Sequence, residues 1–200
     1  MRGKFIVVYG MNNLGKSTLL AGLVEHLREQ KVHASYLKYP IYDLPSGRRI
    51  NAYLREGNPE NLTAIQAQGI FAQNRRDYEP QLIDRLQSGE WIIAEDYTGT
   101  GIAWGMTYGV PLETLEEMNK GLLEPDLAIL LDGERFTAGI EKNHKHEESD
   151  LWDVGRKVHL QMAERLGWYL VNANQEREEV LGDTIRIIEG KFNVSRERER

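Results

Sequence analysis

The chain has 200 residues, of which 40% are hydrophobic, and a formal net charge of -6 from 25 Lys and Arg against 31 Asp and Glu. This length is sufficient for one domain with a full core, and the charge gives none of the electrostatic footprint expected of a protein that binds duplex nucleic acid. The absence of cysteine excludes disulfides and thiolate metal sites, as is common in a reducing compartment such as the cytoplasm, and no apolar run approaches the roughly 20 residues that span a membrane.

The first predicted element is a strand at residues 5–9, which leaves no room before it for a signal peptide. It leads directly into Gly10–Ser17, which reads Gly-Met-Asn-Asn-Leu-Gly-Lys-Ser and matches the G-x-x-x-x-G-K-[ST] pattern of a phosphate-binding loop. A helix with an apolar face is predicted next, at residues 17–29. A strand that delivers such a loop to a helix N-terminus aims backbone N–H groups at phosphate oxygens. We therefore predict a nucleoside triphosphate site.

Each residue type in this loop has a chemical reason to be there. Lys16 can reach the β- and γ-phosphates, and the Ser17 hydroxyl can ligate Mg²⁺. The backbone of the loop cradles the phosphate oxygens. The residues predicted to bind ATP are Asn13, Leu14, Gly15, Lys16, Ser17 and Thr18.

The rest of the chain alternates apolar strand-like runs with helical patterns. Further strands are predicted at residues 32–38, 91–94, 127–131 and 169–171. Helices are predicted at residues 48–55, 62–78, 80–87, 111–123, 135–142, 150–166 and 176–189. This alternation predicts the three-layer α/β fold of P-loop NTPases, with a central parallel sheet of about five strands and helices on both faces. We expect a single domain at residues 1–194, followed by a solvated Arg- and Glu-rich tail at 195–200.

Acidic residues follow two of the predicted strands. Glu95 and Asp96 come after residues 91–94, and Asp132 comes after residues 127–131. Ligands of parallel sheets bind at the carboxyl ends of the strands, where an acid beside a phosphate loop commonly holds Mg²⁺. We therefore predict that Ser17 and one of Glu95 and Asp96 hold the metal, and we assign this role to Glu95. The alternative is that these carboxylates only cap a turn.

Two further segments suggest phosphate and base recognition. Lys142 to His146 form a cationic stretch that suits a lid at about 135–150 closing over transferring phosphates, although a solvated loop remains the alternative. The two histidines lack a third ligand at convincing spacing, which argues against a metal site. Phe71 and Arg75 are four residues apart, so they share a helical face that suits a flat heterocycle. Taken alone, Phe71 also fits a core position and Arg75 a surface position.

Together these segments resemble the thymidylate kinase family of nucleoside monophosphate kinases over about residues 4–190. Besides the phosphate loop, Tyr39-Pro40 resembles the family's Phe-Pro segment, and residues 71–75 resemble its Phe-x-x-Asn-Arg. Residues 95–104 resemble its Asp-Arg-Tyr-x-x-Ser-x-x-Ala-Tyr/Phe. Residues 144–147 occupy the place of the lid's Glu-Arg-Tyr/Phe-Glu, so that Lys145 takes the position of the Arg.

This resemblance implies a kinase that uses ATP and Mg²⁺ to phosphorylate a nucleoside monophosphate, with dTMP as the expected acceptor. It also implies small-molecule nucleotide substrates and a homodimer. The catalytic residues that it implies are Lys16, Glu95, Asp96 and Lys145, with His144 or Lys142 assisting from the lid. The acceptor-binding residues that it implies are Asn12, Tyr42, Arg48, Phe71, Arg75, Thr100 and Trp104.

Three positions of this chain depart from the family pattern. Asn12 replaces an acid that touches the acceptor's sugar, and Tyr42 and Asp96 replace two arginines that contact the acceptor's phosphate. A dianionic phosphate would therefore face a carboxylate, and like charges that close cost of order several kcal/mol at low effective dielectric.

Three interpretations of these departures remain open. In the first, the acceptor is still a monophosphate and Arg48, Arg49, Arg75 or Arg76 supplies the missing charge. In the second, the acceptor is a nucleoside or another hydroxyl compound, whose proton Asp96 accepts. In the third, the protein binds nucleotide as a regulator and has lost phosphoryl transfer.

Overall fold

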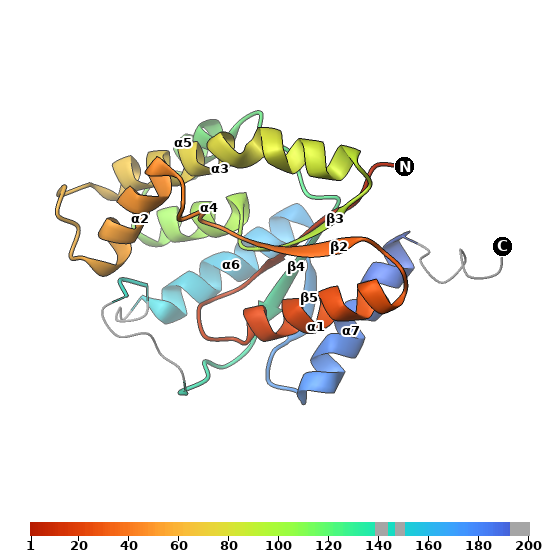
Figure 1. Cartoon of the computed structure of the whole chain (residues 1–200). Helices are drawn as coiled ribbons and strands as arrows, with labels where there is room; N and C mark the ends of the chain where they lie inside the picture. The colour runs from red at the N-terminus through yellow and green to blue at the C-terminus, as the bar shows by residue number, and fades with distance from the viewer. Residues whose placement is uncertain (139–143, 147–150, 193–200) are drawn as a thin grey trace.

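A computed structural model describes residues 1–138, 144–146 and 151–192 of the chain (Figure 1). Its five strands are β1 (Phe5–Tyr9), β2 (Ala34–Lys38), β3 (Trp91–Glu95), β4 (Leu127–Asp132) and β5 (Tyr169–Asn172). Its helices are α1 (Lys16–Glu29), α2 (Pro45–Arg55), α3 (Ala64–Gln87), α4 (Thr98–Thr107), α5 (Leu112–Asn119), α6 (Trp152–Leu166) and α7 (Arg177–Phe192). No helix among the described residues is long and apolar enough to cross a membrane.

The strands form one parallel sheet in the order β2-β3-β1-β4-β5, which confirms the predicted α/β fold. In the centre of the sheet, Val8 of β1 is paired with Glu95 of β3 on one side and with Ile129 of β4 on the other. Because the strands run in the same direction, the end of β1 lies beside the end of β3. The sheet therefore brings the phosphate loop and the two acids after β3 to the same edge.

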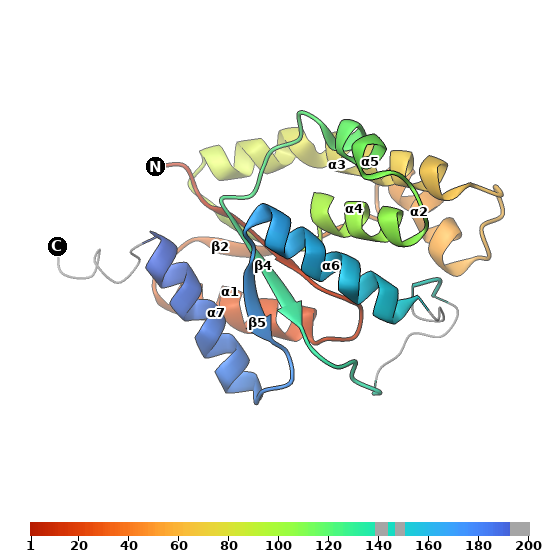
Figure 2. The same ribbon diagram turned by 180° about the vertical axis from the view of Figure 1, so that it is seen from behind.

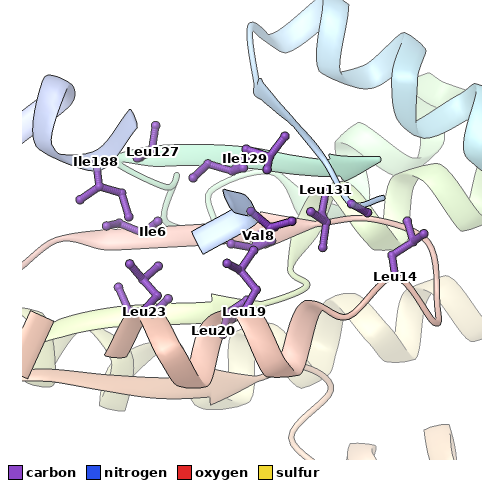
Figure 3. Packing of buried hydrophobic residues seen from close by; sticks show 14 of the residues in the cluster. Ile6, Val8, Leu14, Leu19, Leu20, Leu23, Leu127, Ile129, Leu131 and Ile188 are labelled. Carbon is purple, nitrogen blue, oxygen red and sulfur yellow. The ribbon is translucent and has the colours of Figure 1, made fainter. Parts of the chain in front are cut away.

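Helices cover both faces of the sheet (Figures 1 and 2). Ile6 and Val8 of β1 face α1 and α7, whose Leu20 and Ile188 belong to the same buried cluster (Figure 3). The alternate residues of β1 face α3, α4, α5 and α6 in a second buried cluster. The central strand is thus buried on both faces, which explains why it reads as an uninterrupted apolar run.

Helix α4 was not predicted from the sequence. It contains Gly99, Gly101 and Gly105, and glycine disfavours a helix interior by roughly 0.5–1 kcal/mol relative to alanine. Close packing explains two of them, because a Cβ at Gly99 would lie 2.4 Å from the Trp168 ring and one at Gly105 would lie 2.5 Å from Leu115. Tertiary packing therefore overrides the low helix propensity of this segment.

Other differences concern element boundaries. The helices predicted at 62–78 and 80–87 form one helix, α3, with Pro80 inside it and a capping box between Thr63 and Gln66 at its start. The helix predicted at 135–142 is wrong for residues 135–138, which contain no helix. Residues 139–142 of that helix, and the predicted tail at 195–200, lie outside the described residues.

Candidate active site

A cavity of about 390 Å³ opens at the carboxyl edge of the sheet. Its walls come from the phosphate loop, the ends of β2 and β3, helices α2, α3 and α4, and residues 144 and 146. One end therefore lies at the N-terminus of α1, and the other lies between α2, α3 and α4. We call these the donor end and the acceptor end, after the predicted roles of their residues.

The backbone of the phosphate loop has the left-handed turns that its sequence suggests. Asn13 and Gly15 have φ values of 63° and 82°, and Gly15 is the N-cap of α1. Gly10 has a φ of 147°, and a Cβ there would lie 2.5 Å from the carbonyl oxygen of Leu131. The glycines thus allow the loop to curl tightly between two strands and deliver α1 to the cavity.

Lys16 is buried and folds back over its own loop. Its Nζ donates hydrogen bonds to the carbonyl oxygens of Gly10 and Met11, both at 2.9 Å. It also lies 4.0 Å from Oδ1 of Asp96. The ammonium group is therefore held at the donor end, in the place where phosphate oxygens can replace the carbonyl oxygens.

Ser17 and Glu95 form the second feature of the donor end. The Ser17 hydroxyl donates to Glu95 at 2.7 Å, and Glu95 also accepts hydrogen bonds from Lys38, at 2.9 Å, and from the Tyr36 hydroxyl. Burial raises the pKa of Glu95, but Lys16, Lys38 and the hydrogen bonds outweigh it, so the pKa lies below its usual value. The carboxylate is therefore ionised at neutral pH.

An ionised carboxylate beside a hydroxyl is a hard oxygen pair of the kind that Mg²⁺ prefers. Across the described part of the chain, no group of three or more His, Cys, Asp or Glu side chains is placed to hold a metal ion. Ser17 and Glu95 would therefore hold Mg²⁺ together with water and phosphate oxygens, as Mg²⁺ sites of phosphoryl-transfer enzymes commonly do.

Asp96 turns toward the cavity because its backbone is left-handed, with a φ of 62°. Its Oδ1 accepts a hydrogen bond from Thr100 at 2.8 Å. Burial raises the pKa of Asp96, Lys16 partly offsets this, and the neighbouring Glu95 charge raises it again. Asp96 and Thr100 thus lie together in the cavity wall between the donor and acceptor ends.

Phe71 and Arg75 of α3 both line the acceptor end. Arg75 is only 3% exposed, and burial lowers its pKa to about 10. Its Nε donates to Asn119 at 3.1 Å and its Nη1 to the Tyr97 carbonyl at 3.4 Å, whereas its buried Nη2 has no hydrogen-bond partner among the described residues. The guanidinium group therefore presents an unused donor at the bottom of this end.

The loop after β2 is clamped onto α3. Asn74 donates to the Ile41 carbonyl at 2.9 Å and accepts from the Ile41 N–H at 2.8 Å. Gly47 of α2 packs against the same loop so closely that a Cβ there would lie 2.0 Å from the Ile41 carbonyl oxygen. These contacts fix the backbone of Tyr42, whose side chain lines the cavity beside Arg55.

Of the described residues of the predicted lid, 144–146 lie beside Trp104, whereas 136–138 lie beside the phosphate loop. The His146 ring stacks on the Trp104 ring with centroids 3.9 Å apart. The backbone N–H of His146 donates to Nδ1 of His144 at 3.2 Å. Burial, followed by the nearby cations, lowers the pKa of His146 well below its usual value, so its ring is neutral at pH 7. Lys145 points elsewhere, with its Nζ 4.8 Å from the Tyr53 ring centroid.

The cavity brings together most of the predicted site residues. These are Asn12, Asn13, Gly15, Lys16, Ser17, Thr18, Tyr42, Phe71, Arg75, Glu95, Asp96, Thr100 and Trp104. Leu14 instead packs in the core, whereas Arg48 is exposed and, like Lys145, does not line the cavity. Lys142 lies outside the described residues.

The other candidate arginines also lie away from the cavity. Arg49 forms an ion pair with Glu60 at 2.6 Å, and Arg76 donates to the Lys120 carbonyl at 3.1 Å. Lys38, Arg55 and Gln68 line the cavity although they were not among the predicted site residues. Only Lys38 had a signal in the sequence, since it ends the predicted second strand.

Several known thymidylate kinases are similar to this chain in sequence or in fold. The profile of the thymidylate kinase family matches residues 8–184. The thymidylate kinase of Dictyostelium discoideum is 27% identical over 195 residues, which cover 96% of this chain and 87% of the relative. The thymidylate kinase of Schizosaccharomyces pombe is 29% identical over 157 residues, which cover 78% and 74%. The solved structure of Candida albicans thymidylate kinase shares the fold, with a TM-score of 0.84, 23% identity and coverage of 96% of this chain and 94% of that one.

Proposed function

The chain belongs to the thymidylate kinase family, and we propose that it transfers the γ-phosphoryl group of ATP to dTMP. Members of this family are phosphotransferases. One observation carries the proposal. A single cavity joins a phosphate loop and an oxygen pair suited to Mg²⁺ to a pocket that holds Phe71 and the unpartnered Nη2 of Arg75.

At the donor end, backbone N–H groups of residues 13–17 would hold the phosphates of ATP, aided by the N-terminus of α1. Lys16 would exchange its bonds to the Gly10 and Met11 carbonyls for bonds to phosphate oxygens. Ser17 and Glu95 would hold Mg²⁺, which when bound neutralises charge on the β- and γ-phosphates.

At the acceptor end, Arg75 can donate to a carbonyl group at the edge of a base, while the Phe71 ring supports its face. A buried guanidinium with an unmade hydrogen bond favours a ligand that accepts it, because leaving such a donor unpaired costs about 1–3 kcal/mol. Thymine has two carbonyl groups and a flat apolar face, and it satisfies both requirements.

Three further features of the protein are proposals that rest on the family resemblance and the sequence. We propose that residues 1–194 form one kinase domain whose lid spans about 135–150, and that Lys145 moves toward the phosphates when the lid closes. We propose a cytoplasmic homodimer that acts on free nucleotides and not on nucleic acid. Light scattering of the purified protein tests the dimer.

A nucleoside acceptor is the second candidate, and Asp96 favours it. This carboxylate lines the cavity, and the raised pKa of Asp96 brings it closer to that of a useful proton acceptor. Such an enzyme would phosphorylate thymidine instead of dTMP.

A product assay separates these candidates. The purified chain is supplied with ATP, Mg²⁺ and either dTMP, thymidine, dUMP or dCMP, and the products are resolved by chromatography. We expect dTDP as the main product and none from the Lys16→Met variant. Phosphorylation of thymidine alone would favour the second candidate, and turnover of no acceptor at high enzyme concentration would contradict both.

A further inference from the structure

The proposed acceptor carries a phosphate dianion, which needs a cation in the cavity. The two positions where the family places arginines hold Tyr42 and Asp96. Among the described residues, four cationic side chains line the cavity wall, namely Lys16, Lys38, Arg55 and Arg75. The structure therefore allows each of them to be considered in turn.

Three of these cations lie at the donor end, beside the predicted metal site or at the predicted base contact. Lys16 is bonded to the carbonyl oxygens of the phosphate loop at the donor end. Lys38 forms an ion pair with Glu95 at 2.9 Å, beside the predicted metal site. Arg75 is buried at the bottom of the acceptor end, where it holds Asn119 and the Tyr97 carbonyl.

Arg55 occupies a different part of the wall. It is the last residue of α2, and its Nη1 donates to the Tyr42 hydroxyl at 2.7 Å and to Asn51 at 3.4 Å. Its guanidinium carbon lies 5.1 Å from the centroid of the Tyr42 ring, within the range of a cation–π interaction. The guanidinium group of Arg55, which comes from α2, therefore lies at the tip of the Tyr42 side chain.

This guanidinium is positioned before any ligand binds. Gly47 fixes the backbone of Tyr42, since a Cβ at this glycine would lie 2.6 Å from the Tyr42 Cα. Asn74 clamps the preceding residue, Ile41, from α3. Tyr42 in turn holds Arg55, so little side-chain entropy is lost when the guanidinium meets an anion.

We propose that Arg55, braced by Tyr42, binds the phosphate group of the nucleotide acceptor. The inference deepens the proposed function and rests on it. A planar guanidinium can bond two phosphate oxygens at once, which suits a terminal phosphate better than a point charge does. In this arrangement the cation comes from position 55, and the phenol at position 42 aims it.

The same arrangement answers the problem that Asp96 raises. Asp96 already accepts a hydrogen bond from Thr100 and lies 4.0 Å from Lys16, so its charge is partly balanced within the wall. Arg55 then adds a further positive charge to the wall of the same cavity. Arg55 also lines the cavity together with the lid histidines, His144 and His146.

The test compares a nucleotide with its nucleoside. Binding of dTMP and of thymidine is measured by calorimetry in the absence of ATP, for the wild type and for Arg55→Gln. We expect dTMP affinity to fall about 30-fold, as for loss of a charged hydrogen-bonding pair, and thymidine affinity to change less than about threefold. The matched control, Arg165→Gln, removes an exposed arginine that pairs with Glu116 and should change neither affinity.

Two more variants keep the test decisive if Arg55→Gln folds poorly. Tyr42→Phe removes only the brace and should weaken dTMP binding about threefold to fivefold, as one neutral hydrogen bond would. Arg48→Gln tests the arginine suggested by the sequence, and we expect it to bind dTMP as the wild type does. Unchanged dTMP affinity in Arg55→Gln, or equal losses for dTMP and thymidine, would overturn the inference.

Failure of the Arg55 inference can be distinguished from failure of the proposed function. If the wild type makes dTDP and Arg55→Gln binds dTMP normally, the function stands and the role of Arg55 is wrong. If the wild type neither binds nor phosphorylates dTMP, the proposed function itself fails, and the inference fails with it.

Discussion

The two ends of the cavity are built in different ways. The donor end comes mainly from one continuous segment, residues 10–18, to which β3 adds Glu95. The acceptor end is assembled from the loop after β2, from α2, α3 and α4, and from residues 144 and 146. A continuous segment keeps its functional groups in sequence order, whereas an assembled surface can supply the same group from several elements.

This difference explains two of the three departures from the family, Tyr42 and Asp96, whereas Asn12 lies within the phosphate loop itself. The donor end keeps the lysine and the hydroxyl in their expected places, Lys16 and Ser17. The acceptor end lacks two expected cations, yet it has a guanidinium from Arg55 at the tip of Tyr42. At an assembled surface, a residue at a different position in the sequence can therefore supply the same charge to the cavity.

The strongest test of this division is Lys16→Met. We expect kcat to fall by about 10³-fold or more, because this ammonium would stabilise charge that develops on the transferring phosphoryl group. Binding of dTMP should be unchanged, since Lys16 is bonded within the donor end. Steady-state kinetics and calorimetry measure the two effects, and a comparable loss of dTMP affinity would show that the ends are not separate.

The next largest effect is expected for Glu95→Gln, also at the donor end. The amide keeps the size of the side chain but removes the charge that would hold Mg²⁺ with Ser17. We expect about 10²-fold lower kcat at ordinary Mg²⁺ and partial recovery when Mg²⁺ is raised. An unaltered Mg²⁺ dependence would exclude Glu95 as a metal ligand.

His159, which is buried behind Trp104, offers a pH test. Burial lowers the pKa of His159 from 6.5 to about 4, and its ring lies 6.4 Å from that of Trp104. Between these pH values the unfolded chain binds a proton that the folded chain does not. Stability that is fully present above pH 6.5 should therefore be lost as the pH falls toward 4, by up to about 3 kcal/mol.

Denaturant unfolding at several pH values checks this prediction. The variant His159→Met should lose less stability over the same pH range, because it has no imidazole to protonate. Equal slopes for the wild type and the variant would mean that other groups control the acid sensitivity.

At the acceptor end, Arg75→Met should raise the KM for dTMP about 10- to 50-fold and change kcat much less. The methionine fills similar space but cannot donate to the base. Arg75→Lys is the matched control and should recover part of the affinity. A larger effect on ATP than on dTMP would place Arg75 at the wrong end of the cavity.

The smallest effect is expected for Asn13→Gly. The Asn13 side chain donates to the carbonyls of Phe136 and Ala138, which links the phosphate loop to the first residues of the predicted lid. Glycine keeps the left-handed backbone, whose φ is 63°, but removes these bonds. We expect a rise of about twofold to fivefold in the KM for ATP, measured at saturating dTMP.

The sequence predicts the donor end well because its signals are local. A strand, a glycine-rich turn and a helix follow one another directly, and Glu95 is placed beside them by the parallel register of β1 and β3. The centre of the sheet could be predicted for the same reason, since β1, β3 and β4 are mostly buried and read as apolar runs. Helix α4 could not, because its glycines are selected by contacts with Trp168 and Leu115 that the sequence does not display.

The acceptor end shows a second limit of prediction from the sequence. Arg48 and Arg55 are seven residues apart, so on a helix they lie on nearly the same face, about two turns from each other. The helical pattern cannot tell which turn meets the cavity, since that depends on how α2 packs against α3. Likewise, no local signal indicates that Lys145 lies over the rings of Tyr53 and Tyr108.

The stacking of Trp104 on His146 has a practical consequence. Trp104 is one of four tryptophans in the chain, and it is the one of them that lines the cavity among the described residues. Indole emission responds to what touches the face of the ring. An acceptor that enters beside Trp104 should therefore change the intrinsic fluorescence of the unmodified protein, so that the cavity contains its own optical reporter of occupancy.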